Sequence, residues 1–400
     1  MPLFNYKVVQ EASARGATLF SPTQAQLDAA KDYARKVRDP KFLKQKETAV
    51  RGLLIQEVLQ SVLGYTPYDP AKPYSLAVEL QIGAGIVDAA LGSFTADNVE
   101  GIAAPFELKG PGTTDLDRMM PGRGRSPVQQ AWEYAIDAPG ARWVLVSNCV
   151  EIRLYAFGRG RDAYERFDLT RLDEPFEHER LWRILGAKNL FGGHTDQLLR
   201  DTDNAYRDIT NELYKQYKGL RERLIGFLTN GGEGPRLDAL KAIEIAQKLL
   251  DRVLFIAFAQ RTELLPGQLL EKAAKEINTF APQPLWRNFL GLFRFVDIGS
   301  PTNHIPAYNG GLFAQDPLAD EIILPDHLAQ EVALLGQWDY RRDLPVTVLG
   351  HLFEQSITDI EALKAGTAPD VSKRKREGVV YTPDTITRFL VERTVGLTLD

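Results

Sequence analysis

The apolar residues of this chain change their spacing near residue 190, and this change limits the folds that the chain can adopt. Between residues 76 and 157 they form short runs separated by Gly, Asp and Asn, at 76–82, 85–94, 103–110, 142–148 and 151–157. Such runs, bounded by turn residues, are typical of strands. Beyond residue 190 they recur at helical spacing, as in Ile209, Leu213, Tyr217, Leu220, Leu224 and Leu228. The sequence therefore predicts a domain with a sheet, followed by a mainly α-helical domain.

Helical patterns surround the strand-like runs. Residues 22–37 and 41–63 precede them, and a helix is predicted to start at Ser126 and Pro127, between the third and fourth runs. Ser is a good N-cap and Pro suits the first helical position. We therefore expect an α/β domain over 1–185, with a mixed sheet flanked by helices. A helical connector is expected over 186–370, and the start of a further domain over 371–400.

Composition narrows the class of protein. The 400 residues are 44% hydrophobic and 25% charged, which is typical of a soluble globular protein. We find no secretory signal and no apolar run long enough to span a membrane. The single cysteine, Cys149, excludes an internal disulfide and fits a reducing cytoplasm. The net charge of −5 gives no bulk attraction to nucleic acid, although a local basic groove could still bind it.

Several common kinds of site are not supported. One cysteine cannot build a zinc–thiolate site, and we find neither a Gly-rich phosphate loop nor a G-x-S-x-G motif. The histidines are scattered, and surface or capping positions explain them better than metal binding does: His178, His194, His304, His327 and His351.

Two carboxylates and a lysine lie on the strand-like runs. Because side chains alternate along a strand, Glu107 and Lys109 are expected on one face, with Phe106 and Leu108 on the other. Asp88 lies in the middle of the preceding run. If the two strands pair, Asp88, Glu107 and the backbone carbonyl of Leu108 would suit a hard cation such as Mg²⁺. The alternative is a Glu–Lys pair on a surface strand.

Two further polar residues could join this group. Glu57 falls within the apolar stripe of the 41–63 helix, so it meets a partner charge, faces a polar site, or reaches solvent at the edge of the stripe. Gln130 and Tyr134 are four residues apart and share one face of the helix that starts at Ser126. The alternative is that Trp132 and Ala135 make the core contact and Gln130 is solvated.

These residues resemble the PD-(D/E)xK nuclease superfamily, in which an Asp precedes a Glu-x-Lys. Here the pattern is Asp88, a gap of eighteen residues, and then "ELK". "QAWEYA", which contains Gln130 and Tyr134, resembles the Q-x-x-x-Y element of one branch of that superfamily. The resemblance implies that Asp88 and Glu107 bind the metal and that Lys109 activates water. It also implies accessory roles for Gln130 and Glu57.

Residues 240–390 resemble a second family, the single-chain restriction–modification enzymes of type IIG and related type I proteins. The resemblance rests on segments in the family order, including "IPAYNGGLFAQDP", "VTVLGHLFEQSITDIE" and "REGVVYTPDTITRFLVERTVG". It implies an N-terminal nuclease, a helical connector, an adenine amino-methyltransferase and a later target-recognition domain. Tyr381, Thr382 and Pro383 would then lie against S-adenosylmethionine, although a helix cap also explains them. The methyltransferase's Asn/Asp-Pro-Pro-Tyr/Phe motif is missing, so we expect an N-terminal fragment.

The sequence thus predicts a cytoplasmic, Mg²⁺-dependent endonuclease that acts on duplex DNA. Two alternatives remain open: a catalytically silent DNA-binding or interdomain scaffold of an adenine methyltransferase, and a phage-defence effector that acts on modified DNA.

Overall fold

A computed structural model describes residues 2–16, 22–230, 235–277, 280, 283–308 and 310–338, and the single positions 350, 360, 361, 390 and 394. The chain divides into two compact units, Met1–Ala205 and Tyr206–Asp400. The sequence places the first boundary at 185/186, whereas this division falls within a long helix. The predicted domain start at 371–400 lies outside the described ranges, apart from two single positions.

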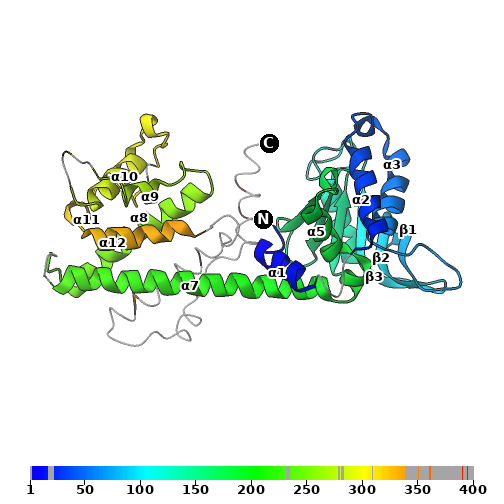
Figure 1. Ribbon diagram of the computed structural model, residues 1–400, viewed down its shortest axis with the longest axis horizontal. Coiled ribbons are helices and arrows are strands. Elements are labelled where there is room, and N and C mark those ends of the chain that lie inside the picture. The colour runs from blue at the N-terminus through cyan, green and yellow to red at the C-terminus, as the bar shows by residue number, and fades with distance from the viewer. Residues whose placement is uncertain are drawn as a thin grey trace. The chain divides into compact units, whose positions relative to one another are not determined.

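The first unit is built on one six-stranded mixed sheet (Figure 1). Its strands lie side by side in chain order: β1 (Tyr74–Ile82), β2 (Gly85–Thr95), β3 (Asn98–Leu108), β4 (Trp143–Ser147), β5 (Glu151–Ala156) and β6 (Tyr164–Asp168). Neighbouring strands are antiparallel except β3 and β4, which run parallel. A parallel pair needs a crossover, and α4 (Pro127–Asp137) lies in that connection. The predicted mixed sheet flanked by helices is confirmed, and β6 is an addition that the sequence analysis missed.

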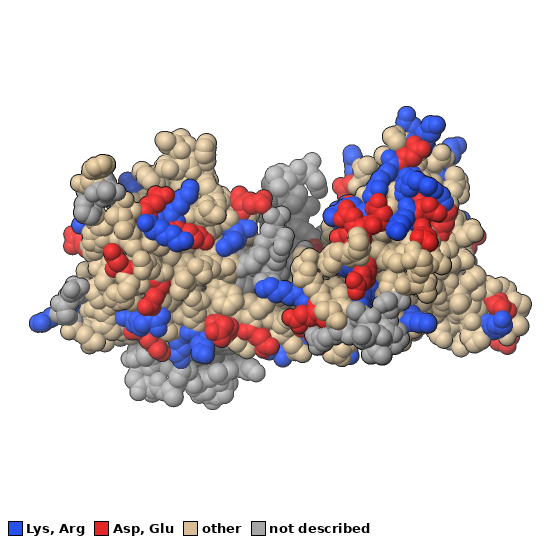
Figure 2. All heavy atoms as spheres, in the orientation of Figure 1, with Lys and Arg blue, Asp and Glu red and all other residues tan. Residues whose placement is uncertain are grey.

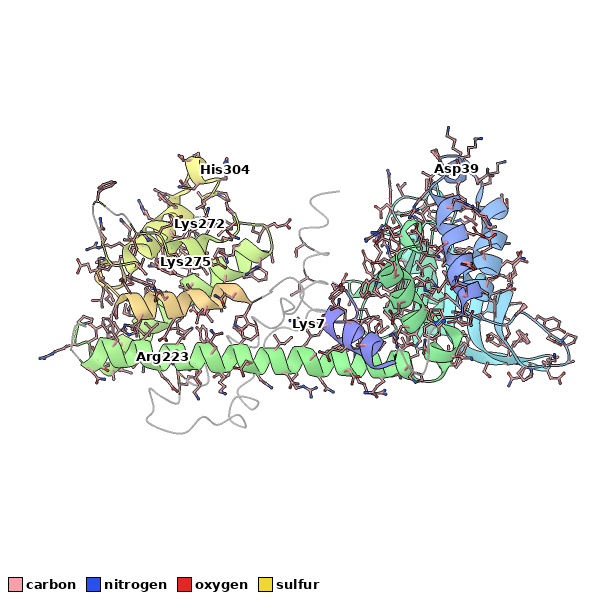
Figure 3. The ribbon with its side chains drawn as sticks, in the orientation of Figure 1. Lys7, Asp39, Arg223, Lys272, Lys275 and His304 are labelled. Atoms are coloured by element: carbon pink, nitrogen blue, oxygen red, sulfur yellow. The ribbon has the colours of Figure 1, made fainter. Side chains whose placement is uncertain are left out.

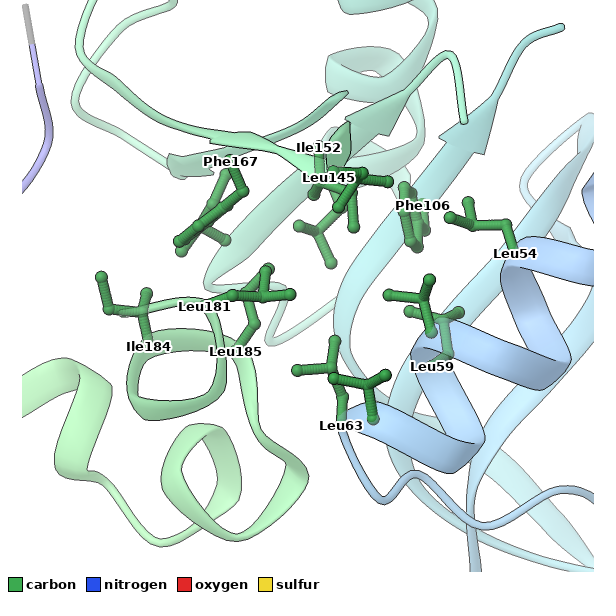
Figure 4. Packing of buried hydrophobic residues seen from close by; sticks show 14 of the residues in the cluster. Leu54, Leu59, Leu63, Phe106, Leu145, Ile152, Phe167, Leu181, Ile184 and Leu185 are labelled. Carbon is green, nitrogen blue, oxygen red and sulfur yellow. The ribbon is translucent and has the colours of Figure 1, made fainter. Parts of the chain in front are cut away.

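Helices cover both faces of this sheet. One face packs on α2 (Gln24–Val37), α3 (Glu47–Leu53), the π-helix η2 (Leu54–Val62) and α5 (Pro175–Leu185), and the other on α4. Figure 4 shows Leu54 and Leu59 of η2 beside Phe106 of β3, and Leu181 and Leu185 of α5 on the same side of the sheet, facing Leu145 of β4 and Ile152 of β5. The remaining helices of this unit are α1 (Tyr6–Gly16), η1 (Phe42–Lys44), η3 (Leu169–Arg171) and α6 (Ala187–Phe191).

The predicted helix over 41–63 is wrong in detail. The segment contains η1, then α3, and then a nine-residue π-helix in which Leu63 N donates to Val58 O, five residues back. The wider turn still buries Leu54, Ile55, Val58, Leu59 and Val62 together. The apolar pattern does not distinguish an α-helix from this wider form, because both place the stripe against the sheet.

The helix at Ser126 forms as predicted. Ser126 accepts a hydrogen bond from Gln129 N, and the Gln129 side chain accepts one from Ser126 N, which is a complete capping box. Pro127 occupies the first helical position. The cap fixes the start of α4, and with it the face that α4 presents to the sheet.

The second unit is helical, as the sequence predicts. Its helices are the greater part of α7 (His194–Asn230), followed by α8 (Ala239–Arg261), α9 (Leu269–Ala273), α10 (Trp286–Ile298), η4 (Pro301–Asn303), α11 (Pro317–Glu321), α12 (Asp326–Ala333) and η5 (Leu334–Gln337). The predicted stripe of α7 enters the core, with Leu213, Tyr217, Leu220, Leu224 and Leu228 fully buried. Across the described residues, no helix combines the length and apolar character needed to cross a membrane.

Candidate active site

Strands β2 and β3 part at the point where the predicted carboxylates lie. Their pairing reaches Ala89 and Phe106, and β3 continues along β4, with Glu107 opposite Val146 and Leu108 opposite Ser147. The Leu108 N–H, which no longer has a β2 carbonyl, donates instead to Asp88 Oδ2 at 2.8 Å. The Asp88 side chain therefore lies against the Glu107–Leu108 peptide.

Lys109 links two of the oxygens that the sequence analysis assigns to a metal. Its ammonium donates to Glu107 Oε1, and to the Leu108 carbonyl at 3.1 Å. Glu107 and Lys109 are both buried, whereas Phe106 and Leu108 enter the core on the other face of the strand. One cationic group therefore already bonds both oxygens, so they converge on a single position.

The surroundings of Glu107 disfavour the charged form of its carboxyl group. Burial raises its pKa to about 7, and the nearby charges of Asp88 and Glu47 add to that rise, while Lys109 opposes it. Its second oxygen, Oε2, is buried without a hydrogen-bond partner. A buried carboxylate oxygen in this condition is an available ligand for a cation, because a cation would offset the cost of burial.

Gln130 and Tyr134 lie beside the start of β2. Gln130 Nε2 donates to Tyr134 Oη at 3.4 Å, and Tyr134 Oη donates to the Ile86 carbonyl at 2.8 Å, two residues from Asp88. Gln130 is buried and its Oε1 has no hydrogen-bond partner, so the alternative in which it is solvated is wrong. A side chain on Gly85 would lie 2.7 Å from the Tyr134 ring, so the glycine lets this helix approach the strand.

Glu57 does not join this group in the structure. Its partner is Lys36 on α2, because η2 packs against α2 and presents Glu57 to it. Of the possibilities left open by the sequence, the structure realises the partner charge. The cofactor residues Tyr381, Thr382 and Pro383 lie outside the described residues.

Three charged residues near the site were missed by the sequence analysis. Arg51 of α3 donates to Asp88 Oδ1 at 3.0 Å and to Glu79 Oε1 of β1 at 2.6 Å. Glu47, one turn before Arg51, starts α3 close to the end of β3, since a Cβ on Gly110 would lie 3.1 Å from Glu47 N. Their four-residue spacing on one helix was the available signal. For Glu79 the signal was the short "IGAG" turn, in which Ile82 pairs with Gly85 and thereby fixes the register of β1 on β2.

The donor set fits a hard divalent cation. Within the described ranges, no three His, Cys, Asp or Glu side chains form a group that could hold a metal ion, so the protein ligands here would be two carboxylates and a carbonyl. Mg²⁺ characteristically takes one or two carboxylates and keeps several waters. Asp88, Glu107 and the Leu108 carbonyl meet that requirement, and the unpartnered Glu107 Oε2 supplies the free oxygen.

Comparisons with known proteins do not identify a family for this chain. No protein-family model matches the chain, and neither does any curated protein. Among solved structures, one match is the type IIG restriction endonuclease BpuSI, with 13% identity and a TM-score of 0.23. The alignment covers 88% of this chain and 33% of that one, so this chain spans about a third of that protein. A TM-score of this size does not establish a shared fold.

Proposed function

We propose that this chain is the Mg²⁺-dependent endonuclease portion of a restriction–modification enzyme and that it hydrolyses phosphodiester bonds in duplex DNA. The observation that carries the proposal is the convergence of Asp88, Glu107, the Leu108 carbonyl and Lys109 at the place where β2 and β3 part. Two carboxylates, with a buried lysine bonded to one of them, are groups that suit metal-assisted phosphodiester hydrolysis.

The chain's own groups would act as follows. Asp88, Glu107 and the Leu108 carbonyl would hold Mg²⁺, which when bound supplies Lewis-acid stabilisation of the charge that develops on the phosphate. Leu108 N–H fixes the Asp88 carboxylate, so its orientation does not depend on a bound ion. Lys109, which bonds Glu107, would orient a water molecule and stabilise negative charge beside the carboxylates.

A basic surface next to the site supports DNA as the substrate. Lys41, Lys44 and Lys46 are exposed, and no described residue forms an ion pair with any of them. They precede Glu47, whose backbone lies against Gly110, the residue after Lys109. Figure 2 shows Lys and Arg side chains gathered over α2 and α3, mixed with acidic ones. Unpaired lysines beside a phosphodiesterase site suit contact with the DNA backbone, despite the overall charge of −5.

The methyltransferase part of the proposal rests on the sequence alone. S-adenosylmethionine binding by Tyr381, Thr382 and Pro383, and the partnership with methyltransferase and target-recognition domains, remain predictions, because these three residues lie outside the described ranges.

Calorimetric titration with Mn²⁺, a common substitute for Mg²⁺ in binding measurements, tests the metal site without requiring cleavage. We expect the 400-residue chain to bind Mn²⁺ in a manner that Asp88→Asn and Glu107→Gln each weaken by more than about tenfold, since each removes a charged ligand. Asp173→Asn is the matched control, because Asp173 is a carboxylate paired with Arg38 elsewhere in the same unit. Binding that is unchanged in Asp88→Asn would overturn the proposal and favour the scaffold alternative.

A further inference from the structure

One arginine is shared between a proposed metal ligand and a second carboxylate outside the site. The two terminal nitrogens of Arg51 bond different acids: Nη1 lies 3.0 Å from Asp88 Oδ1 and Nη2 lies 2.6 Å from Glu79 Oε1. The Asp88 side chain is 16% exposed, that of Arg51 26% and that of Glu79 61%. The guanidinium therefore connects an inner carboxylate to one that stands in solvent.

The backbone places these two carboxylates opposite each other. Val78 pairs with Ala89 and Leu80 pairs with Val87, so Glu79 and Asp88 lie between these pairs on adjacent strands. Glu79 has φ of 54°, a left-handed conformation that is unusual for a residue within a strand.

The side-chain alternation of β2 changes at the same place. Val87 and Ala89 would share a face in a regular strand, yet they pack in different core clusters. The irregularity is therefore common to both strands, and it coincides with the two carboxylates that Arg51 binds.

Asp88 presents its two oxygens to different partners. Oδ2 is held by the Leu108 N–H, which any bound ion would leave in place, whereas Oδ1 is held by Arg51. A divalent cation at Asp88 would therefore be opposed by the positive charge of Arg51 at Oδ1. Glu79 gives the guanidinium a second carboxylate, so that Arg51 can withdraw from Asp88 without becoming unpaired.

We infer that Arg51 is a positioning residue that sets the cation affinity of the Asp88–Glu107 site, and that Glu79 acts on that affinity by drawing Arg51 away from Asp88. The inference rests on the proposed function, because it takes Asp88 as a metal ligand. Removing the charge of Arg51 and removing the charge of Glu79 should therefore change the cation affinity in opposite directions. A salt bridge with a purely structural role would not produce opposite effects.

The test is Mn²⁺ titration of the 400-residue chain and its variants. Arg51→Gln should tighten Mn²⁺ binding about three- to tenfold, because a competing charge is removed while Leu108 N–H still orients Asp88. Glu79→Gln should weaken it about two- to fivefold, because Arg51 is then committed to Asp88. The double variant should bind like Arg51→Gln, since Glu79 acts only through Arg51.

Matched controls remove the effect of overall charge. Arg38→Gln and Asp173→Asn make the same charge changes in an exposed pair of the same unit, and neither should alter Mn²⁺ affinity. Thermal unfolding in chelator checks that each variant folds. If Arg51→Gln does not fold, Glu79→Gln can still overturn the inference, because Glu79 is largely exposed and unchanged Mn²⁺ affinity in that variant would contradict it.

The outcomes separate the inference from the proposed function. Weaker Mn²⁺ binding by Arg51→Gln would overturn the inference. So would an equal loss of Mn²⁺ affinity on Glu79→Gln in the presence and in the absence of Arg51, since Glu79 would then act by its own charge. If both single variants bind Mn²⁺ with unchanged affinity and binding still depends on Asp88, the inference fails while the proposed function stands. If the unmodified chain shows no binding that depends on Asp88, the proposed function and the inference both fail.

Discussion

The carboxylate of Asp88 accepts the backbone N–H of Leu108 at 2.8 Å, a hydrogen bond between a side chain and the backbone of the next strand. It takes the place of a ladder hydrogen bond where β2 and β3 part, and it brings Asp88 beside Glu107 and Lys109. Because the contact uses the backbone of Leu108, it fixes the Asp88 side chain independently of the side chain at residue 108.

Replacing Lys109 by Met should destabilise the first unit in a pH-dependent way. Glu107 would lose its buried counter-charge, and its pKa, already about 7, would rise further, so it would have to take up a proton to remain buried. We expect a loss of about 1–3 kcal/mol at pH 8 and a smaller loss at pH 6. Urea unfolding in chelator measures it.

The double variant Glu107→Gln/Lys109→Met should recover part of that stability, because it leaves no unpaired charge. Lys36→Met, which unpairs the more exposed Glu57, is the matched control and should cost less. A loss for Lys109→Met that did not vary with pH would argue against a charged Glu107–Lys109 pair.

Gly110→Ala should destabilise the contact between β3 and α3. The added methyl group would lie 3.1 Å from Glu47 N and 3.2 Å from its Cα, both of them backbone atoms that cannot move aside cheaply. We expect about 1–3 kcal/mol of destabilisation by urea unfolding. Gly112→Ala is the control, since nothing lies within 4 Å of the new atom there. Equal effects of the two variants would show that α3 does not pack on Gly110 as described.

Neutralising Lys41, Lys44 and Lys46 with Gln should weaken DNA binding and reduce its salt dependence. If each lysine contacts a phosphate, the slope of log affinity against log salt concentration should become shallower by about 2–3. Fluorescence anisotropy of a labelled duplex in Ca²⁺, which commonly supports binding without cleavage, would measure this slope.

The control for this experiment lies in the helical unit. Lys241, Lys272 and Lys275 are three exposed lysines there, two of them labelled in Figure 3, and replacing them by Gln makes the same change in net charge. Their replacement should leave the slope close to that of the unmodified chain. If both triple variants changed the slope equally, the lysines beside the site would have no special role in DNA binding.

A partly buried acid, Asp251, should make the helical unit less stable as the pH rises from about 4 to 6. Burial raises the pKa of Asp251 from 3.8 to about 6, although Tyr217 and Gln247 donate hydrogen bonds to it. The folded state therefore binds the proton more tightly than the unfolded state, and stability is lost as pH passes from the unfolded to the folded pKa.

The difference in unfolding free energy between the unmodified chain and Asp251→Asn should change by up to about 3 kcal/mol over this pH range. Asn cannot titrate but can still accept from Tyr217, so it serves as the reference. Urea unfolding followed by circular dichroism measures the difference. A constant difference between pH 4 and 6 would contradict the raised pKa.

Much of the local structure could be predicted from the sequence, because it depends on near neighbours. The strands around Asp88 and Glu107 and the cap at Ser126 follow from alternation and from capping preferences. The ion-pair partners of Glu57 and Arg51 could not be predicted in this way, because they depend on which helix packs beside η2 and on where α3 meets the sheet. Asp88 lies where β2 and β3 part, and no spacing rule indicates where a pair of strands will separate.

Cleavage of supercoiled plasmid DNA in Mg²⁺ tests the central claim most directly. We predict that the 400-residue chain nicks or linearises the plasmid in Mg²⁺ but not in chelator. Asp88→Asn, Glu107→Gln and Lys109→Met should each lower the rate at least about a hundredfold, because each removes a proposed metal ligand or the lysine proposed to activate water. Methylated and unmethylated plasmids, compared in the same assay, separate a restriction enzyme from an effector that acts on modified DNA. Cleavage at an unchanged rate by Asp88→Asn or Glu107→Gln would contradict the assignment of this site.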